Sequence, residues 1–150
     1  MPHQEQDAAG IRLLRFLNVI LPLGLGSLIY LGWRTSSLKM FDWVDSLGLT
    51  GPVSALREGL SESLPSLPDW VLYSLPDAAW VYSFTAVNWL IWGTTDSRER
   101  SFWLALAALL AGGSELGQWA SLVPGTFDPT DLSLIVLAAP LALITSRRLS

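Results

Sequence analysis

Glu115 is the residue whose type and position most clearly indicate chemistry. It is the one charged residue in the apolar run from Ser101 to Val123. An ionisable side chain costs about 2.5–3.5 kcal/mol near the centre of a membrane-spanning helix, so it is a functional candidate by default. Gln118 lies three residues later, on the same face of a helix. Counting back from Val123 places Glu115 about 10–12 Å below the outer end of that helix.

Glu115 and Gln118 together predict a polar pocket that opens outward. In this pocket Glu115 would accept a proton, bind the head group of a ligand or bind a cation. The alternative is structural: a protonated Glu115 that hydrogen-bonds to a neighbouring helix. The sequence leaves both interpretations open.

Three aspartates stand where two helices are expected to begin. Asp128 is placed as an N-cap, with Pro129 as the first helical residue and Asp131 closing an acidic capping box. Asp77 occupies the first turn of another helix, where a carboxylate suits the macrodipole. Capping alone explains all three, but both starts are expected near the outer end of the Glu115 helix. These carboxylates are therefore candidate ligand-binding residues around one outward mouth.

Asn88 is a further candidate because it follows Asp77 by three helical turns and shares its face. A hydrogen bond between helices is the more common role of such a residue. Gly113 and Gly117 form a Gly-x-x-x-Gly pair, which allows another helix backbone to approach closely. This pair predicts helix packing, either within the chain or in a homo-oligomer.

The composition excludes several classes of site. Of 150 residues, 51% are hydrophobic and only 15% are charged, where a soluble domain usually has about 25% charge. The net charge of −4 argues against nucleic acid as a partner. The chain has no Cys and one His, His3, so thiol chemistry and multi-histidine metal sites are excluded. We therefore predict no catalytic residue, no metal site and no cofactor.

Four charge-poor runs are long enough to cross a membrane, which takes about 20 mostly apolar residues. They predict an all-α fold, a membrane helical bundle of four transmembrane helices in one domain, 16–146, between tails 1–15 and 147–150. The predicted spans are 16–33, 76–93, 101–123 and 129–146.

The basic residues predict the orientation of these spans. Six of the nine lie at segments that a four-span topology places on one side, the cytoplasmic side by the positive-inside rule. We therefore expect a multi-pass protein of the plasma (inner) membrane with both termini in the cytoplasm. The six residues are Arg12, Arg15, Arg98, Arg100, Arg147 and Arg148.

The predicted outer loop, residues 34–75, is too long for a structureless connection. Apolar residues recur at helical spacing from Leu38 to Leu47 and from Val53 to Leu64, and Pro52 suits a first helical turn. We expect two short amphipathic helices, which either pack over the bundle or lie on lipid.

Two motifs resemble the VanZ-like family of small multi-pass bacterial membrane proteins. They are Ser114-Glu-Leu-Gly-Gln118 and Pro124-Gly-Thr-Phe-Asp-Pro-Thr-Asp131. The family pairs a Glu-x-x-Gln on one span with an Asp-containing turn that leads into the next. The stretch Leu75–Tyr82 resembles the start of an earlier span in related proteins.

The resemblance covers roughly the second half of the chain. The arginine that the family usually carries between Gln and Asp is missing here. The resemblance implies a link to reduced susceptibility to lipoglycopeptide antibiotics, but it implies no reaction. It also assigns Glu115, Gln118, Asp128 and Asp131 to the family's polar site.

The favoured hypothesis is a non-enzymatic membrane protein that binds the head group of a lipid-linked or envelope ligand near Glu115. The alternative is a small transporter or channel subunit in which Glu115 carries protons or a cation. A lipid-modifying enzyme is least favoured, because the spans contain no His or Cys for proton transfer near neutral pH. Membrane lipids are the expected partners, and a homo-oligomer is left open.

Overall fold

The computed structural model describes residues 2–64, 67–93, 95 and 97–150. This part of the chain is all-helical and contains no strand. Its helices are α1 (Pro2–Trp33), α2 (Lys39–Ser46), α3 (Thr50–Ser63), α4 (Asp69–Tyr73), α5 (Leu75–Trp92), α6 (Arg98–Trp119) and α7 (Pro129–Arg148).

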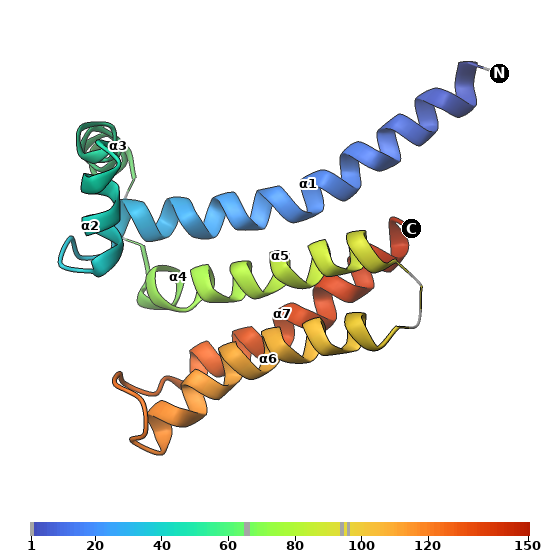
Figure 1. Cartoon of the computed structure of the whole chain (residues 1–150). Helices are drawn as coiled ribbons and strands as arrows, with labels where there is room; N and C mark the ends of the chain where they lie inside the picture. The colour runs from blue at the N-terminus through green and yellow to red at the C-terminus, as the bar shows by residue number, and fades with distance from the viewer. Residues whose placement is uncertain (1, 65–66, 94, 96) are drawn as a thin grey trace.

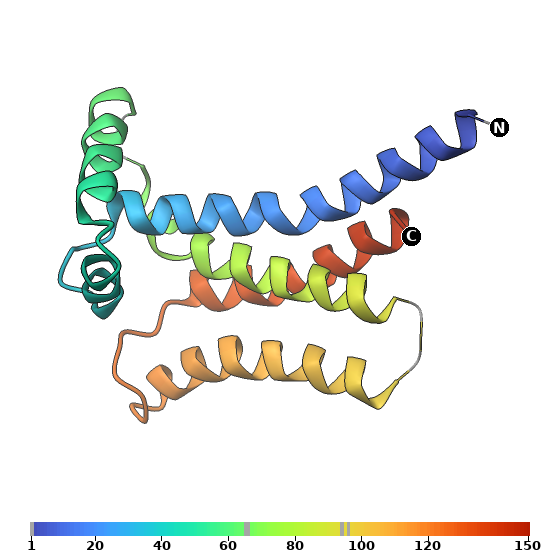
Figure 2. The ribbon, with the colours of Figure 1, turned by 45° about the horizontal axis from the view of Figure 1, so that its top comes forward.

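Four long helices form the body of the molecule, and α5 lies at its centre. Helix α5 packs against α1, α6 and α7, whereas α1 and α6 lie on opposite sides of the layer that α5 and α7 form (Figures 1 and 2). The short helices α2, α3 and α4 lie at one end. Both chain termini lie at the other end of the bundle, where α5 ends and α6 begins (Figure 1).

The predicted spans overlap the four long helices, and two of their bounds differ by four residues or more. Helix α1 begins at Pro2 and so includes most of the predicted tail 1–15. Helix α6 ends at Trp119, so the predicted end at Val123 is wrong. The chain turns there because the carbonyl of Gly117 accepts hydrogen bonds from the backbone N–H groups of both Leu122 (2.8 Å) and Val123 (3.2 Å).

The predicted outer loop contains the short helices that its apolar spacing indicated, and Pro52 lies in the first turn of α3. Helix α3 packs on the end of α1. Arg57 Nη1 donates a hydrogen bond to the carbonyl oxygen of Leu31 at 2.7 Å, and Leu60 lies against Gly32. Helix α3 therefore packs on α1, and α2 contacts α3, whereas contact of either helix with lipid stays a prediction.

Small side chains fill the interior and large apolar side chains cover the outside. The buried residues of α5 and α7 are mainly Ala, Ser and Thr. Soluble monomers rarely expose large contiguous apolar patches, whereas helix interfaces in membranes are rich in small residues. The exposed apolar residues of the long helices include Phe16, Leu21, Leu25, Phe84, Ile91, Phe102, Leu109, Leu110, Leu116, Val136, Leu137 and Ile144.

Two helices in the described part of the chain are long and apolar enough to cross a membrane, α1 from Ala9 to Trp33 and α7. The same length and composition occur in the core helix of a soluble protein, but such a helix is mostly buried. Here only 17% of the apolar window of α1 and 22% of that of α7 are buried. Helix α5 carries Asp77, Asn88 and three Trp.

Gly26 permits the close contact between α1 and α5, and this gives a first prediction. A Cβ at Gly26 would lie 3.0 Å from the carbonyl oxygen of Pro76 and 3.1 Å from Ala79 Cβ, whereas a Cβ at Gly24 would meet nothing within 4 Å. We expect Gly26→Ala to be less stable than Gly24→Ala by about 1 kcal/mol, because both gain helix propensity but only Gly26→Ala is overpacked. Thermal unfolding in detergent measures the difference, and equal melting temperatures would show that α1 adjusts without cost.

Candidate functional site

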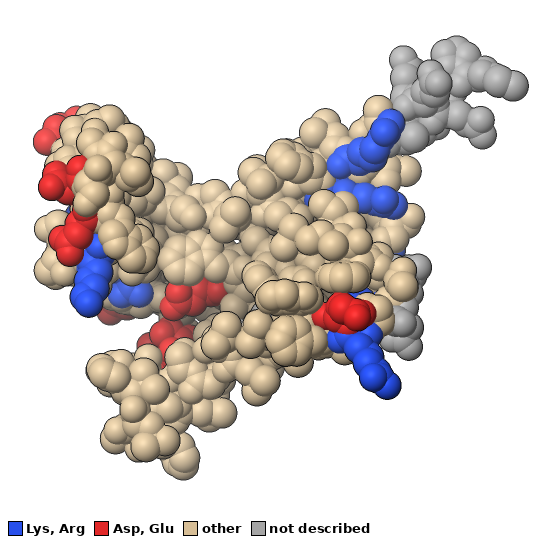
Figure 3. All heavy atoms as spheres, in the orientation of Figure 1, with Lys and Arg blue, Asp and Glu red and all other residues tan. Residues whose placement is uncertain are grey.

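A cavity of about 640 Å³ lies at the end of the bundle that carries α2, α3 and α4. The end of α1, helices α4, α5 and α6 and the start of α7 all contribute to its wall. Figure 3 shows acidic side chains in the hollow between α4 and α5 on one side and α6 on the other. Five carboxylates line the cavity: Asp69, Asp77, Glu115, Asp128 and Asp131.

Glu115 is the least exposed of these carboxylates, with 5% of its surface exposed. Because α6 ends at Trp119, Glu115 lies about 6 Å from the helix end, closer than the sequence suggested. The backbone of Asp128 faces its carboxylate. Its Oε2 atom is buried and has no hydrogen-bond partner among the described residues. A buried polar atom without a partner costs about 1–3 kcal/mol, so the carboxylate is set up for a partner that the chain does not supply.

Asp131, in the first turn of α7, also carries an unpaired oxygen. Its Oδ1 atom is also buried without a hydrogen-bond partner in the described structure. The capping box predicted for Asp131 is therefore wrong. The N-cap predicted for Asp128 is confirmed, because its Oδ1 accepts a hydrogen bond from the backbone N–H of Thr130 at 2.7 Å. Asp131 does not close the box, since the backbone N–H of Asp128, the donor that it would need, is directed at the Glu115 carboxylate.

Arg34, which is not among the predicted site residues, brings a positive charge to the cavity. Its guanidinium lies over the rings of Tyr30 (5.2 Å) and Tyr73 (4.7 Å), which hold it by cation–π attraction. Its Nε is buried and has no hydrogen-bond partner among the described residues. A signal was available: Tyr30 and Arg34 stand four residues apart at the end of an apolar run, the spacing at which helical side chains meet.

Gln118 lines the cavity beside Glu115, as its helical spacing predicted. Its side chain lies against Gly125, where φ is +139° and an added Cβ would fall 2.7 Å from Gln118 Cδ. The turn before α7 therefore requires glycine at this position. Asp77 also lines the cavity, from the first turn of α5.

Asn88 is the predicted site residue that the structure does not bring to the cavity. It is buried, and its Nδ2 donates a hydrogen bond to the carbonyl oxygen of Phe84 in its own helix at 2.8 Å. Asn88 thus satisfies its amide locally, so the predicted hydrogen bond between helices is not what its Nδ2 makes.

Among the described residues, no neighbouring helix packs against the glycine pair on α6. A Cβ at Gly113 would meet nothing within 4 Å, and one at Gly117 would meet Val123 from the following turn. Packing of this face within the bundle is therefore a wrong prediction. Association with a second copy stays a prediction.

A smaller cavity of about 220 Å³ adjoins the acidic one, since Asp77 and Glu115 line both. Its other walls are mainly apolar and come from Trp80, Val81, Ala111 and Ile135. The two cavities together offer a charged mouth and an apolar extension between α5, α6 and α7.

Within the described residues, no three acidic or histidine side chains are grouped so that they could hold a metal ion. The buried oxygens Glu115 Oε2 and Asp131 Oδ1 can accept hydrogen bonds from a donor that enters the cavity.

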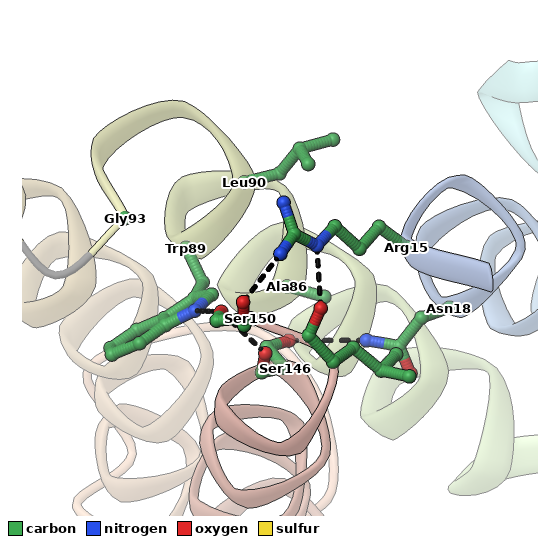
Figure 4. Close-up of a pocket in the computed structure, with 9 residues that line it drawn as sticks. Arg15, Asn18, Ala86, Trp89, Leu90, Gly93, Ser146 and Ser150 are labelled. Carbon is green, nitrogen blue, oxygen red and sulfur yellow. Dashed lines mark hydrogen bonds between the residues drawn. The ribbon is translucent and has the colours of Figure 1, made fainter. Parts of the chain in front are cut away.

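A cavity of about 240 Å³ lies at the opposite end, between α1, α5 and α7 (Figure 4). Its polar groups bind one another. Arg15 donates to the carbonyl oxygens of Leu149 (2.6 Å) and Ser150 (2.8 Å), and Trp89 Nε1 donates to Ser150 Oγ (2.8 Å). These hydrogen bonds connect α1, α5 and the C-terminal end of α7. In the acidic cavity, by contrast, atoms of Glu115, Asp131 and Arg34 have no partner among the described residues.

The cap at Asp128 gives a second prediction. Asp128→Ala removes the acceptor of the Thr130 N–H and should destabilise the fold by about 1 kcal/mol, whereas Asp128→Asn should be nearly neutral because Asn caps equally well. Thermal unfolding of both variants measures this. A large loss of stability in Asp128→Asn would mean that the charge of Asp128, and not only its cap, stabilises the turn.

Comparison with known proteins leaves the family of the chain open. The resemblance to VanZ-like proteins rests on the motifs around Glu115 and Asp128 and stays a prediction. No protein-family model matches the chain, and no curated protein or solved structure is significantly similar to it.

Proposed function

We propose that the chain is a four-span membrane protein whose acidic cavity faces outward. The proposal is supported by the large apolar side chains on the outside of the long helices and by the two helices of spanning length. It is also supported by the distribution of charge. The three segments that carry the six basic residues lie at the end opposite the acidic cavity (Figures 1 and 3).

Reporter fusions test this topology. We expect fusions after Arg98 and Arg148 to report the cytoplasm and a fusion after Arg57 to report the outer side, because the basic residues hold their segments inside. An outer-side signal from the Arg98 fusion would overturn the four-span arrangement.

We propose further that the acidic cavity binds the polar head group of a membrane or envelope ligand, in keeping with the VanZ-like resemblance. The observation that carries this proposal is Glu115 Oε2, a buried acceptor without a partner in a cavity large enough for a head group. Asp131 Oδ1 and Arg34 Nε add a second acceptor and a donor from two other elements. Such groups gain their hydrogen bonds when a ligand enters.

A transporter or channel subunit is the second candidate, and the cavities favour it less. Transport needs a polar route from one side of the bundle to the other. The acidic cavity shares no lining residue with the cavity around Arg15 at the opposite end, whose polar groups bond one another. A binding role needs only the single outward mouth.

A lipid extract tests the binding proposal. The purified full chain would be melted in detergent with and without total lipid extract of a bacterial membrane. We expect the extract to raise the melting temperature of the wild type and of Glu99→Gln, an exposed glutamate on the same helix, but not that of Glu115→Gln. An equal rise in all three proteins would overturn the proposal.

A further inference from the structure

We infer that the ligand is an amphiphile whose head group joins a primary ammonium to a phosphate, the chemistry of phosphoethanolamine. This inference rests on the proposed binding function and names its ligand class. It follows from the signs, the hydrogen-bonding character and the placement of the groups that line the two adjoining cavities.

The acidic groups select a positive charge. Five carboxylates and one arginine line the mouth, and Arg34 attracts one of them, Asp77. Two carboxylate oxygens of the mouth are buried without a partner among the described residues, Glu115 Oε2 and Asp131 Oδ1. Both are hydrogen-bond acceptors when the groups are ionised. An ammonium with three N–H donors would satisfy both, and charge-assisted bonds of this kind are the strong ones.

Arg34 selects a negative charge next to the ammonium. Its guanidinium stays on the cavity wall because Tyr30 and Tyr73 hold its face, which leaves the buried Nε as a donor without a partner. Guanidinium groups match phosphate oxygens well. A ligand with a cation alone would leave this donor unpaired, so a zwitterionic head group fits the cavity better.

The adjoining cavity supplies room for the apolar part of the ligand. It shares Asp77 and Glu115 with the mouth and continues between Trp80, Val81 and Ile135. A hydrocarbon segment there would lie next to the head group at Glu115. This arrangement favours a lipid over free phosphoethanolamine.

Lipids that differ only in the head group test the inference. The full chain in detergent would be titrated with short-chain phosphatidylethanolamine, phosphatidylcholine and phosphatidylglycerol, and with soluble O-phosphoethanolamine, while thermal unfolding is followed. Choline carries no N–H donor, and glycerol carries no cation. We expect phosphatidylethanolamine to bind at least about tenfold more tightly than either lipid, the value of one charged hydrogen bond, and more tightly than the soluble head group.

Two variants test the recognition of the ammonium and of the phosphate separately. Glu115→Gln should abolish the preference for phosphatidylethanolamine over phosphatidylcholine. Arg34→Gln should weaken both lipids by a similar factor and keep the preference, because both carry a phosphate. Lys39→Gln, an exposed neighbouring charge, is the matched control and should bind like the wild type.

Equal affinity for phosphatidylethanolamine and phosphatidylcholine would overturn the inference, as would a preference that survives in Glu115→Gln. Tighter binding of soluble O-phosphoethanolamine would overturn the role of the apolar cavity. If the lipid extract still stabilises the wild type and not Glu115→Gln, only the ligand class is wrong. If the extract acts equally on both, the proposed function itself fails.

Discussion

Glu115→Gln is expected to leave the protein folded and to abolish its function in the cell. The assay is a strain that lacks the protein, scored for susceptibility to envelope-directed antibiotics including lipoglycopeptides, and complemented with each variant. Wild type and Glu99→Gln should restore the wild-type susceptibility. Glu115→Gln should behave as the empty vector does.

The physical basis is the position of the Glu115 carboxylate. Glu115 is 5% exposed, and its Oε2 accepts no hydrogen bond from the described residues. Gln keeps the shape but removes the charge, so a cationic group loses a charge-assisted bond. Such a bond contributes about 1.5–3 kcal/mol, which lowers affinity about 10- to 100-fold. Stability should stay equal or rise, because a buried charge without a partner is costly to ionise.

Melting temperatures separate this expectation from misfolding. Glu115→Gln should unfold at or above the wild-type temperature in the same detergent. Full rescue by Glu115→Gln would mean that Glu115 is a structural group. A variant that is inactive and also unstable would point to the same structural role.

The bounds of a helix could be predicted from the sequence where local signals mark its end. Asp128 followed by Pro129 marks the start of α7, and Pro76 marks the start of α5, so both were located to within a residue. The end of α6 was missed because apolar residues continue to Val123. Composition reports hydrophobicity, whereas the helix ends where the Gly117 carbonyl closes a turn.

The site could be read from the sequence only in part. Five of the predicted site residues line one cavity, because the four-helix topology brings their helix ends together. They are Asp77, Glu115, Gln118, Asp128 and Asp131. Their role in binding stays a prediction.

Asp69, Tyr73 and Arg34 were not predicted as members of this group, although Arg34 follows Tyr30 by four residues at the end of an apolar run. Their approach depends on how the end of α1 packs on α4 and α5, which is a long-range contact without a local pattern. The loss of the family arginine was visible in the sequence. The presence of Arg34 in the cavity was not.

Tyr82 holds the centre of a second polar network, which gives the largest expected effect on stability. Its hydroxyl donates to Asn18 Oδ1 at 2.6 Å and lies 2.6 Å from Thr145 Oγ1, and Asn18 Nδ2 donates to Ser146 Oγ at 3.1 Å. The network therefore joins α1, α5 and α7, and the buried residues of α5 and α7 are mainly small. Polar bonds of this kind stabilise helix association where the hydrophobic effect between helices is absent.

Tyr82→Phe should lower the free energy of unfolding by about 1–3 kcal/mol, because it leaves the partly buried Asn18 Oδ1 without its donor. Tyr73→Phe is the matched control. Its hydroxyl makes no hydrogen bond within the described chain and its side chain is exposed, so its stability should be unchanged. Thermal and denaturant unfolding in detergent measure both variants.

A double-mutant cycle decides whether the network acts as a unit. Asn18→Leu removes the acceptor that Tyr82→Phe would otherwise leave unpaired, so the double variant should be less destabilised than the sum of the single variants, by at least about 0.5 kcal/mol. Additive losses would show that Asn18 and Tyr82 stabilise the bundle independently. In that case the small side chains of α5 and α7, and not this network, would fix the position of α1.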